Sequence, residues 1–306
     1  MATDPTLTEL DNDHLETVVY HNREYQLYAL VNNIYFEPVD EDEVWRLQML
    51  DRVFNLVFDN RLIFPPIHRL RRILECGYGA GGWAIATAQA HPTCEVSNLS
   101  RFRWCTVLPL PRMGESSWGM NNVNKAPKVE LFAFSSNYFD LVHSQMVAGG
   151  VNSGRWSEYL RDIYRVIRPG GWCQMVELYH NAQSDNGTLT PQHALSRWSH
   201  LYLEAAALYK DPRAANHMGR RMRQAGFQDI EITTITLPMC AWPTVVDPSQ
   251  HNIGLANTEN IGPMLSSLAT YPFTELLGMS ITDVQLLVAQ AKAEAANPGL
   301  KPYFPL

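Results

Sequence analysis

The stretch Glu75-Cys76-Gly77-Tyr78-Gly79-Ala80-Gly81-Gly82-Trp83 has the residue types and spacing best suited to holding a ligand. Gly77, Gly79 and Gly81 alternate along it, and glycine lets a backbone approach a ligand without a Cβ in the way. The residues leading up to Glu75 predict a buried strand, and residues 83–90 have strong helix formers at helical spacing. A strand, a glycine turn and the free amides of a helix N-terminus form half of a nucleotide-type site.

The dinucleotide-binding fingerprint is the first interpretation to consider. Its spacing, G-x-G-x-x-G, is met only by Gly77, Gly79 and Gly82. The acidic residue that should follow about twenty positions later falls near Glu95, too early in the next strand. The glycines alone are therefore a weak signal for a dinucleotide.

Further polar groups follow the other predicted strands. Ligands of open α/β sheets bind outside the carboxyl ends of the strands. This rule places the glycine turn, Asn98, His143–Met146 and Tyr179–Asn181 around one cleft. His143 and His180 are candidate general bases because a free imidazole titrates near neutrality, and for each the alternative is a structural role.

Aromatic residues in the later part of the chain are candidates for a substrate pocket. We expect an apolar ligand to contact Tyr179, Trp198, Tyr202 and Trp242. No metal site is expected, because the histidines on predicted helices do not share one face with a carboxylate. No cysteine has an evident base beside it, so a thiol nucleophile is not predicted.

The candidate residues named so far can share one edge of a sheet only if strands and helices alternate along the chain. Predicted strands cover residues 73–76, 94–99, 129–132, 139–143, 172–179 and 229–237. Predicted helices cover residues 83–90, 155–167, 192–210, 212–225, 260–277 and 280–296, and a further helix opens at Asp40, its N-cap. Such alternation indicates a largely parallel sheet covered on both faces. The proline- and glycine-rich segment 103–128 is expected to be a long loop.

Composition limits the function classes. The chain has 306 residues, is 46% hydrophobic and 18% charged, and carries a net charge of −7. An acidic protein without a basic cluster is not expected to bind nucleic acid. We find no membrane-spanning run and no signal peptide pattern. Five dispersed cysteines suit a reducing compartment, so we expect a cytoplasmic protein.

The motif set resembles the class I S-adenosylmethionine-dependent methyltransferases, and more narrowly the fungal LaeA-like group of secondary metabolism. The matching pieces, which run from about Tyr20 to the end, are Tyr35-Phe36-x-Pro38-x-Asp40-Glu41-x-Glu43, Glu75-x-Gly77-x-Gly79-x-Gly81, Gly82-Trp83-Ala84-Ile85-Ala86, Phe139-Asp140-Leu141-Val142-His143, Ser144-Gln145-Met146-Val147-Ala148-Gly149, Arg168-Pro169-Gly170-Gly171-Trp172, Ser184-Asp185-Asn186-Gly187-Thr188 and Pro302-Tyr303-Phe304-Pro305.

The resemblance implies a Rossmann-like domain that binds S-adenosylmethionine. The residues it assigns to this methyl donor are Glu75, Gly77, Gly79, Gly81, Asn98, Gln145, Tyr28 and Tyr35. Composition and turn signals divide the chain into a flexible acidic tail at residues 1–19, an N-terminal helical cap at 20–66, and the domain at 67–306, with a helical C-terminal insertion.

Three departures from the family pattern keep other functions open. Asn98 stands where the family has an acid for the ribose hydroxyls, and a neutral amide makes a weaker contact than a carboxylate. The acidic loop expected on the adenine side, before Ser135, is missing. The chain also ends at Leu306, before the last sheet strand of the family.

The function predicted first is methyl transfer from S-adenosylmethionine to a small-molecule natural product of fungal secondary metabolism. A cyclase, isomerase or pericyclase on the same scaffold is the alternative, and a non-catalytic regulatory partner is a third. The expected oligomeric state is a homodimer.

Overall fold

The computed structural model describes residues 16–99, 132, 134–242 and 248–306, which form two compact units. The first unit contains Leu62–Glu177 and His217–Ile232. The second contains Thr17–Arg61, Leu178–Asn216 and Thr233–Leu306. Each unit is therefore assembled from separate stretches of the chain.

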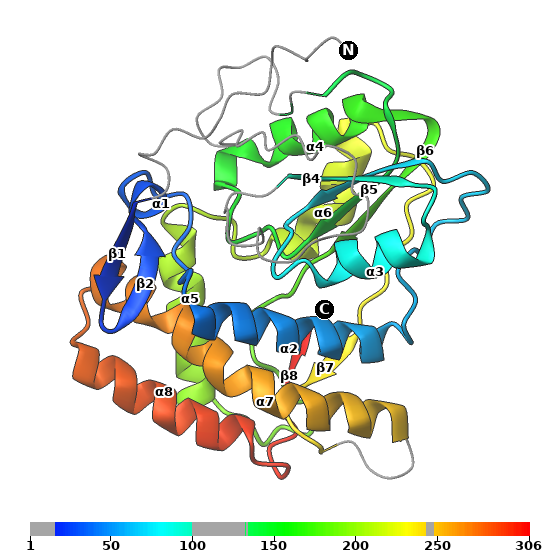
Figure 1. Ribbon diagram of the computed structural model, residues 1–306. Helices are drawn as coiled ribbons and strands as arrows, with labels where there is room; N and C mark the ends of the chain where they lie inside the picture. Colours follow the sequence, from blue (N-terminus) through cyan, green and yellow to red (C-terminus); the bar gives the residue numbers. More distant parts are fainter. Residues whose placement is uncertain (1–15, 100–131, 133, 243–247) are drawn as a thin grey trace. The chain divides into compact units, whose positions relative to one another are not determined.

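The first unit is built on a parallel sheet (Figure 1). Among the described residues its strands lie in the order β4 (Glu95–Leu99), β3 (Arg72–Cys76), β5 (Phe139–Gln145) and β6 (Ile167–Val176). From β3 the chain passes through α3 (Gly82–Ala90) to β4 on one side, whereas β5 lies on the other side of β3. Ligands bind at such a switch point in open α/β sheets. The predicted Rossmann-like α/β fold is confirmed.

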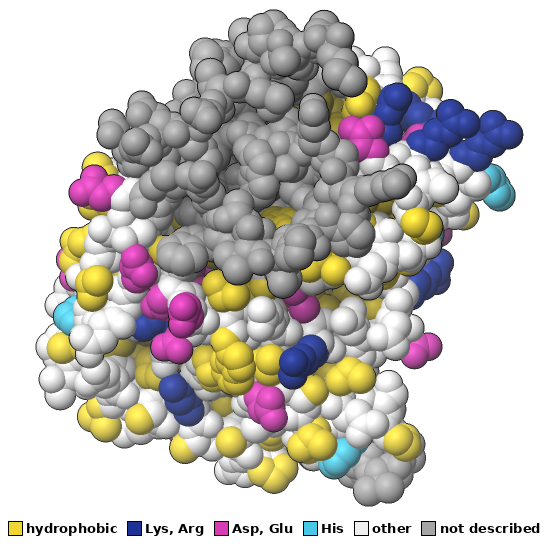
Figure 2. Space-filling model, viewed as in Figure 1, with side chains coloured by type: hydrophobic (Ala, Val, Ile, Leu, Met, Phe, Trp, Pro, Cys, Tyr) yellow, Lys and Arg dark blue, Asp and Glu magenta, His cyan; other side chains and the backbone are white. Residues whose placement is uncertain are grey.

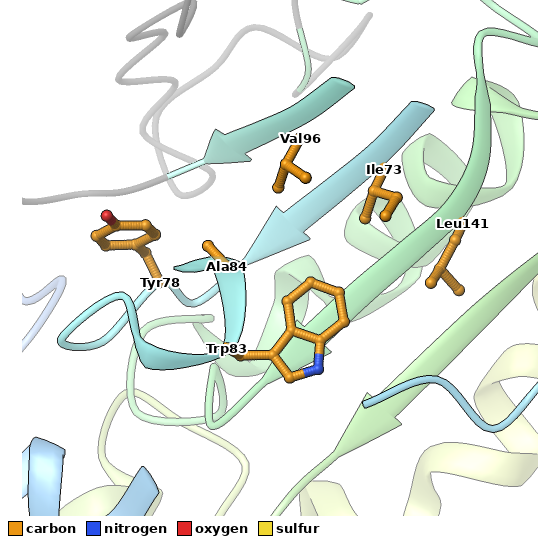
Figure 3. Packing of buried hydrophobic residues seen from close by; sticks show 6 residues of the cluster. All are labelled: Ile73, Tyr78, Trp83, Ala84, Val96 and Leu141. Atoms are coloured by element: carbon orange, nitrogen blue, oxygen red, sulfur yellow. The ribbon is translucent and has the colours of Figure 1, made fainter. Parts of the chain in front are cut away.

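Helix α3 covers one face of this sheet. Trp83 and Ala84, in the first turn of α3, belong to one buried cluster with Ile73, Val96 and Leu141 of the strands. Figure 3 shows the indole of Trp83 pointing from α3 toward the strands that carry Ile73 and Leu141. The residue that follows the glycine turn is thus fixed in the core.

Helix α4 (Trp156–Val166) covers the opposite face. Its Tyr159 hydroxyl lies 2.8 Å from the Ser144 hydroxyl of β5. Helix α6 (Ala214–Ala225) packs beside α4, where the Arg221 guanidinium lies 5.2 Å from the ring centre of Trp156. The sheet is therefore sandwiched, as the alternation of predicted strands and helices required.

The second unit begins with a hairpin that the sequence interpretation missed. Strands β1 (Thr17–Tyr20) and β2 (Arg23–Gln26) pair antiparallel. His21 and Asn22 between them both have positive φ, as a two-residue type I′ turn requires. The end of the predicted acidic tail, from Thr17, is thus an ordered strand, because its residues pair with β2; residues 1–15 lie outside the described part.

Helices make up most of the second unit. After α1 (Leu27–Val31) comes α2 (Glu41–Val57), whose predicted N-cap, Asp40, accepts a hydrogen bond from the Glu43 amide. The remaining elements are α5 (Ala194–Ala207), β7 (Thr236–Pro238), α7 (Pro248–Tyr271), the π-helical turn Pro272–Leu276, α8 (Ile281–Ala295) and β8 (Tyr303–Pro305). Their buried core includes Trp198, Phe273 and Phe304, each 0% exposed.

Two predicted strands need correction. The strand predicted at 229–237 is only β7, because residues 229–234 are largely exposed and the part that pairs, with β8, begins at Thr236. The strand predicted at 172–179 is β6, which begins already at Ile167, where it pairs with Phe139. The predicted loop at 103–128 and most of the predicted strand at 129–132 lie outside the described residues.

Candidate functional site: a polar row at the carboxyl ends of the strands

A row of four polar side chains crosses the sheet of the first unit near its carboxyl edge. Strand register pairs Glu75 of β3 with Asn98 of β4 and with His143 of β5, and pairs His143 with Gln174 of β6. Residues paired in register point to the same face, so we call Asn98, Glu75, His143 and Gln174 the polar row. Each of the four is at most 7% exposed.

The positions two residues earlier on the same strands are all apolar: Val96, Ile73, Leu141 and Trp172. This face of the sheet therefore changes from apolar to polar one or two residues before the strands end. Buried polar groups are costly unless they have partners, so a row of them at a switch point marks a candidate ligand edge.

The three alternate glycines in the turn after β3 serve different purposes. A Cβ on Gly77 would lie 2.1 Å from the Gln145 carbonyl oxygen, and a Cβ on Gly81 would lie 2.6 Å from the Tyr78 hydroxyl. Packing within the protein therefore requires these two glycines. At Gly79, whose φ is +54°, a Cβ would meet nothing within 4 Å. Only Gly79 leaves the backbone open to a ligand.

Asn98 provides the test of whether a methyl donor fits this edge. It is 7% exposed, and its Oδ1 has no hydrogen-bond partner among the described residues. A buried acceptor without a donor is unfavourable unless a ligand completes it. A ribose hydroxyl is such a donor, and the open turn at Gly79 can admit the amino-acid end. These residues fit S-adenosylmethionine, although the contacts predicted for Glu75, Gly77, Gly79, Gly81 and Asn98 stay predictions.

The structure gives His143 a packing role instead of the predicted base role. It is 1% exposed, and its ring stacks on the Trp83 indole with the ring centres 3.9 Å apart. Both ring nitrogens have polar partners, Gln174 Nε2 at Nδ1 and Gln145 Oε1 at Nε2. Burial lowers the pKa of His143 to about 3, so it stays neutral. A ring enclosed in this way cannot exchange a proton with a substrate.

The loop after β5 is fixed by a carboxylate from β6. Glu177, just beyond β6, accepts hydrogen bonds from the amides of Val147 at 2.9 Å and Ala148 at 3.3 Å. Met146, where the strand turns into the loop, has a φ of +52°. Gln145 is half-buried at the end of β5 in front of this pinned loop, and its predicted donor contact stays a prediction.

The remaining predicted residues lie in the second unit. His180 is partly exposed, and its ring centre lies 4.9 Å from that of Tyr202 and 5.7 Å from that of Phe304. Burial, together with the positive charge of Arg46, lowers its pKa to about 3. His180 is therefore neutral at physiological pH, and the general-base role predicted for it stays a prediction.

Of the four predicted substrate contacts, one is contradicted. Trp198 is 0% exposed and donates its indole N–H to the Leu265 carbonyl, so it belongs to the core. Tyr202 is partly exposed and stacks on Trp198, with ring centres 5.4 Å apart. Tyr179 and Trp242 are also partly exposed. A substrate contact at these three residues stays a prediction.

Tyr35 belongs to a buried charge cluster that the sequence interpretation did not identify. The Tyr35 hydroxyl donates to Glu37 Oε2 at 2.8 Å. Arg46 donates through Nε and Nη2 to Glu43 Oε1, and its Nη2 lies 3.7 Å from Glu37 Oε2. The i,i+3 spacing of Glu43 and Arg46 was the available signal. The predicted donor contacts of Tyr35 and of Tyr28, also in this unit, stay predictions.

We also searched the described residues for metal-ligating groups and membrane-spanning helices. No group of three metal-ligating side chains occurs in the part of the chain that the structure describes. None of the described helices is long and apolar enough to cross a membrane. Figure 2 shows acidic, basic and hydrophobic side chains interspersed on the face that it draws.

Comparison with known proteins agrees with the geometry. A family model for a methyltransferase domain matches residues 49–232, more than half of the chain. Methyltransferase pytC of Aspergillus terreus is 27% identical over 312 residues, covering 99% of this chain and 90% of that protein. Secondary metabolism regulator LAE1 of Cochliobolus heterostrophus is 29% identical over 290 residues, covering 88% and 87%.

Among solved structures, phosphoethanolamine N-methyltransferase 2 of Haemonchus contortus in complex with S-adenosyl-L-methionine aligns with a TM-score of 0.45 at 14% identity, covering 96% of this chain and 70% of that one. The family match spans β3 through α6, and so includes the glycine turn and the whole polar row. The chain therefore belongs to the methyltransferase-domain family and is a methyltransferase.

Proposed function

We propose that this enzyme methylates a small-molecule natural product of fungal secondary metabolism. The donor half of the proposal rests on the buried Oδ1 of Asn98 at the switch point, which has no hydrogen-bond partner among the described residues. It rests also on the open turn at Gly79, at the same sheet edge. The names of the relatives, a methyltransferase and a regulator of secondary metabolism, support the biological setting.

On the donor side, S-adenosylmethionine supplies a methyl group bound to a positively charged sulfur. Gly79 lets the amino-acid part approach the backbone, and Asn98 accepts a hydrogen bond from a ribose hydroxyl. The first turn of α3 presents amide groups toward the carboxylate, since the first amides of a helix have no partner within it. Methyl transfer is an in-line displacement, so the main task of these residues is positioning.

The second unit by itself carries partly exposed aromatic rings, among them residues predicted to contact the substrate. Tyr202 and His180 lie against the buried side chains of Trp198 and Phe304, so both are held by a rigid core. Aromatic side chains with few polar groups suit an apolar, ring-containing ligand. The neutral imidazole of His180 then orients that ligand through a hydrogen bond.

The acceptor atom needs a lone pair at the moment of the displacement. Groups that ionise readily without a base, such as an acidic phenol, an enol or a carboxylic acid, are therefore the acceptors proposed for the test.

Isothermal titration of the full chain with S-adenosylmethionine tests the donor half, and saturable binding is expected. For the acceptor half, a panel of natural products with phenolic, enolic or carboxylic groups is incubated with the donor, and a product in which one hydrogen is replaced by a methyl group is expected. Absence of donor binding would contradict the proposal. Isomerisation of a panel compound without the donor would instead assign a cyclase or isomerase, and donor binding without any conversion would favour a regulatory partner.

A further inference from the structure

A chain of hydrogen bonds in the first unit starts at a backbone amide and ends at Gln145. The Phe64 N–H donates to Gln174 Oε1 at 2.8 Å, and Gln174 Nε2 lies 3.0 Å from the Leu62 carbonyl oxygen. The same Nε2 lies 3.3 Å from His143 Nδ1, and His143 Nε2 lies 3.3 Å from Gln145 Oε1. We call these contacts the relay from Phe64 through Gln174 and His143 to Gln145.

The direction of the relay is fixed at its start. A backbone N–H can only donate, and a backbone carbonyl can only accept. Phe64 therefore requires the oxygen of the Gln174 amide, and Leu62 requires its NH2 group. The two contacts agree on one orientation of this amide, so its nitrogen must be the atom that faces His143.

That orientation determines the tautomer of His143. Because Gln174 donates to Nδ1, this nitrogen carries no proton, and the proton of the neutral ring is on Nε2. Nε2–H then donates to Gln145 and requires an oxygen there. The Gln145 amide is thereby oriented as well, and its NH2 group is the end that does not face His143.

The surroundings keep the relay in this state. His143 is 1% exposed and its ring lies flat on Trp83, so it can neither rotate into solvent nor gain a proton easily. A protonated ring would place an N–H at Nδ1 against the NH2 group of Gln174, where two donors would oppose each other. The buried ring of His143 therefore makes the orientation of the Gln145 amide depend on the orientation of the Gln174 amide.

We propose that His143 and Gln174 are positioning residues that aim the NH2 group of Gln145, at the carboxyl end of β5, at an acceptor atom of the bound methyl donor. A ring nitrogen or a carboxylate oxygen of S-adenosylmethionine is the kind of atom that this group recognises. The inference rests on the proposed function in that the donor occupies this edge of the sheet. Gln174, which the sequence did not single out, gains a role in donor affinity.

The tautomer can be measured without any ligand. Ring nitrogen-15 NMR of the labelled full chain, with the His143 signals assigned through His143→Gln, should show a neutral ring protonated at Nε2. A ring protonated at Nδ1 would overturn the inference, whatever the chain does with the methyl donor.

Gln174→Glu tests the effect on donor binding. The carboxylate has the shape of the amide but cannot donate, so Nδ1 of His143 takes the proton and the Gln145 amide reverses. The dissociation constant for S-adenosylmethionine, measured by titration calorimetry, should rise about ten-fold, the size expected for one hydrogen bond to a charged or strongly polar group. Gln145→Glu, which removes the NH2 group without changing the buried relay, should raise it similarly.

The matched control is Ser144→Ala. Ser144 lies between His143 and Gln145 but points to the opposite face, where its hydroxyl contacts Tyr159. This variant also loses a buried hydrogen bond on β5, and its dissociation constant should stay within about two-fold of the wild type.

The outcomes separate the two proposals. If the wild type does not bind S-adenosylmethionine, the proposed function fails, while the NMR result still decides the relay. If the wild type binds and Gln145→Glu behaves like Ser144→Ala, the positioning role is wrong. Should Gln174→Glu fail to fold, Gln145→Glu and the tautomer measurement still decide the inference.

Discussion

The imidazole of His143 lies flat against the indole of Trp83, with ring centres 3.9 Å apart and planes inclined by 19°. His143 comes from β5, and Trp83 is the second residue of α3, immediately after the glycine turn. The Trp83 indole N–H also donates to the Leu62 carbonyl at 3.0 Å. This stack joins the turn to the sheet, and it depends on a histidine that stays neutral.

Acid should therefore weaken the fold through His143. Its pKa is about 3 in the folded chain against 6.5 when unperturbed, so below pH 6.5 the unfolded state binds a proton that the folded state does not. The unfolding free energy should fall by about 1.4 kcal/mol per pH unit from this one group. Urea unfolding at pH 7, 6 and 5 measures the slope, and His143→Gln should reduce it by that amount. Equal slopes in the two proteins would contradict the assignment.

Gly77 and Gly79 should separate folding from donor binding. Gly77→Ala would force a methyl group to within 2.1 Å of the Gln145 carbonyl oxygen, so a loss of about 3 kcal/mol or more in the free energy of unfolding is expected. Gly79→Ala meets no atom and should cost only about 1 kcal/mol, for its left-handed backbone.

Among variants that fold, the loss of donor affinity should be larger for Gly79→Ala than for Gly77→Ala, the opposite of the order expected for stability. Gly79→Ala places its methyl group on the open side of the turn, and S-adenosylmethionine binding should fall at least about ten-fold although the chain stays folded. Thermal unfolding and titration calorimetry on both variants check this. Normal donor affinity in Gly79→Ala would place the donor elsewhere.

Asn98 should matter more for the donor than for the fold. Its Oδ1 makes no hydrogen bond with the described residues, so Asn98→Ala removes an unsatisfied acceptor and should change the unfolding free energy by no more than about 1 kcal/mol. The dissociation constant for S-adenosylmethionine should rise about five-fold through the lost ribose contact. A large loss of stability with unchanged affinity would show that a protein group, and not the donor, completes this acceptor.

The sheet could be predicted from the sequence because its signals are local. The strands β3 and β5 are short apolar runs bounded by turn residues, and Asp40 caps α2 as its residue type indicates. The hairpin before α1 was missed because His21 and Asn22 are not the glycine-containing pair that usually marks such a turn. The extent of β6 depends on pairing with Phe139, which no local pattern reports.

The site could be predicted only in part, because register decides it. Glu75, Asn98 and His143 each lie at or near the carboxyl end of a predicted strand, which is visible in the sequence. Their alignment in one row with Gln174 follows from strand pairing across the sheet, and Gln174 looks like an ordinary mid-strand residue. The burial of Trp198 and the neutral state of His180 likewise come from tertiary packing.

The charge cluster of the second unit contains one carboxylate more than it has guanidinium groups. Asp40 binds Arg23 through both oxygens, and Glu43 lies against Arg46 and Arg23. Glu37 accepts from the Tyr35 hydroxyl at 2.8 Å and lies farther, 3.7 Å, from Arg46 Nη2. Burial, and then the negative charge of Glu43, raises the pKa of Glu37 to about 6. Glu37 is therefore the member of the cluster that takes up a proton near neutrality.

Glu37→Gln should consequently stabilise the chain in mild alkali. A carboxyl group whose pKa rises from 4.5 to about 6 on folding contributes stability that is present below pH 4.5 and is lost as the pH rises through 6. The amide does not titrate and still accepts the Tyr35 hydroxyl. At pH 8 the variant should gain about 1 kcal/mol over the wild type, less than the full shift implies because the side chain is 18% exposed. At pH 5 this advantage should be nearly gone.

Tyr35→Phe is the matched control for this prediction. It removes the hydroxyl but leaves the carboxyl group to titrate, so its stability should keep the pH dependence of the wild type. A Glu37→Gln variant that is less stable than the wild type at pH 8 would mean that the ionised carboxylate is a favourable partner of Arg46.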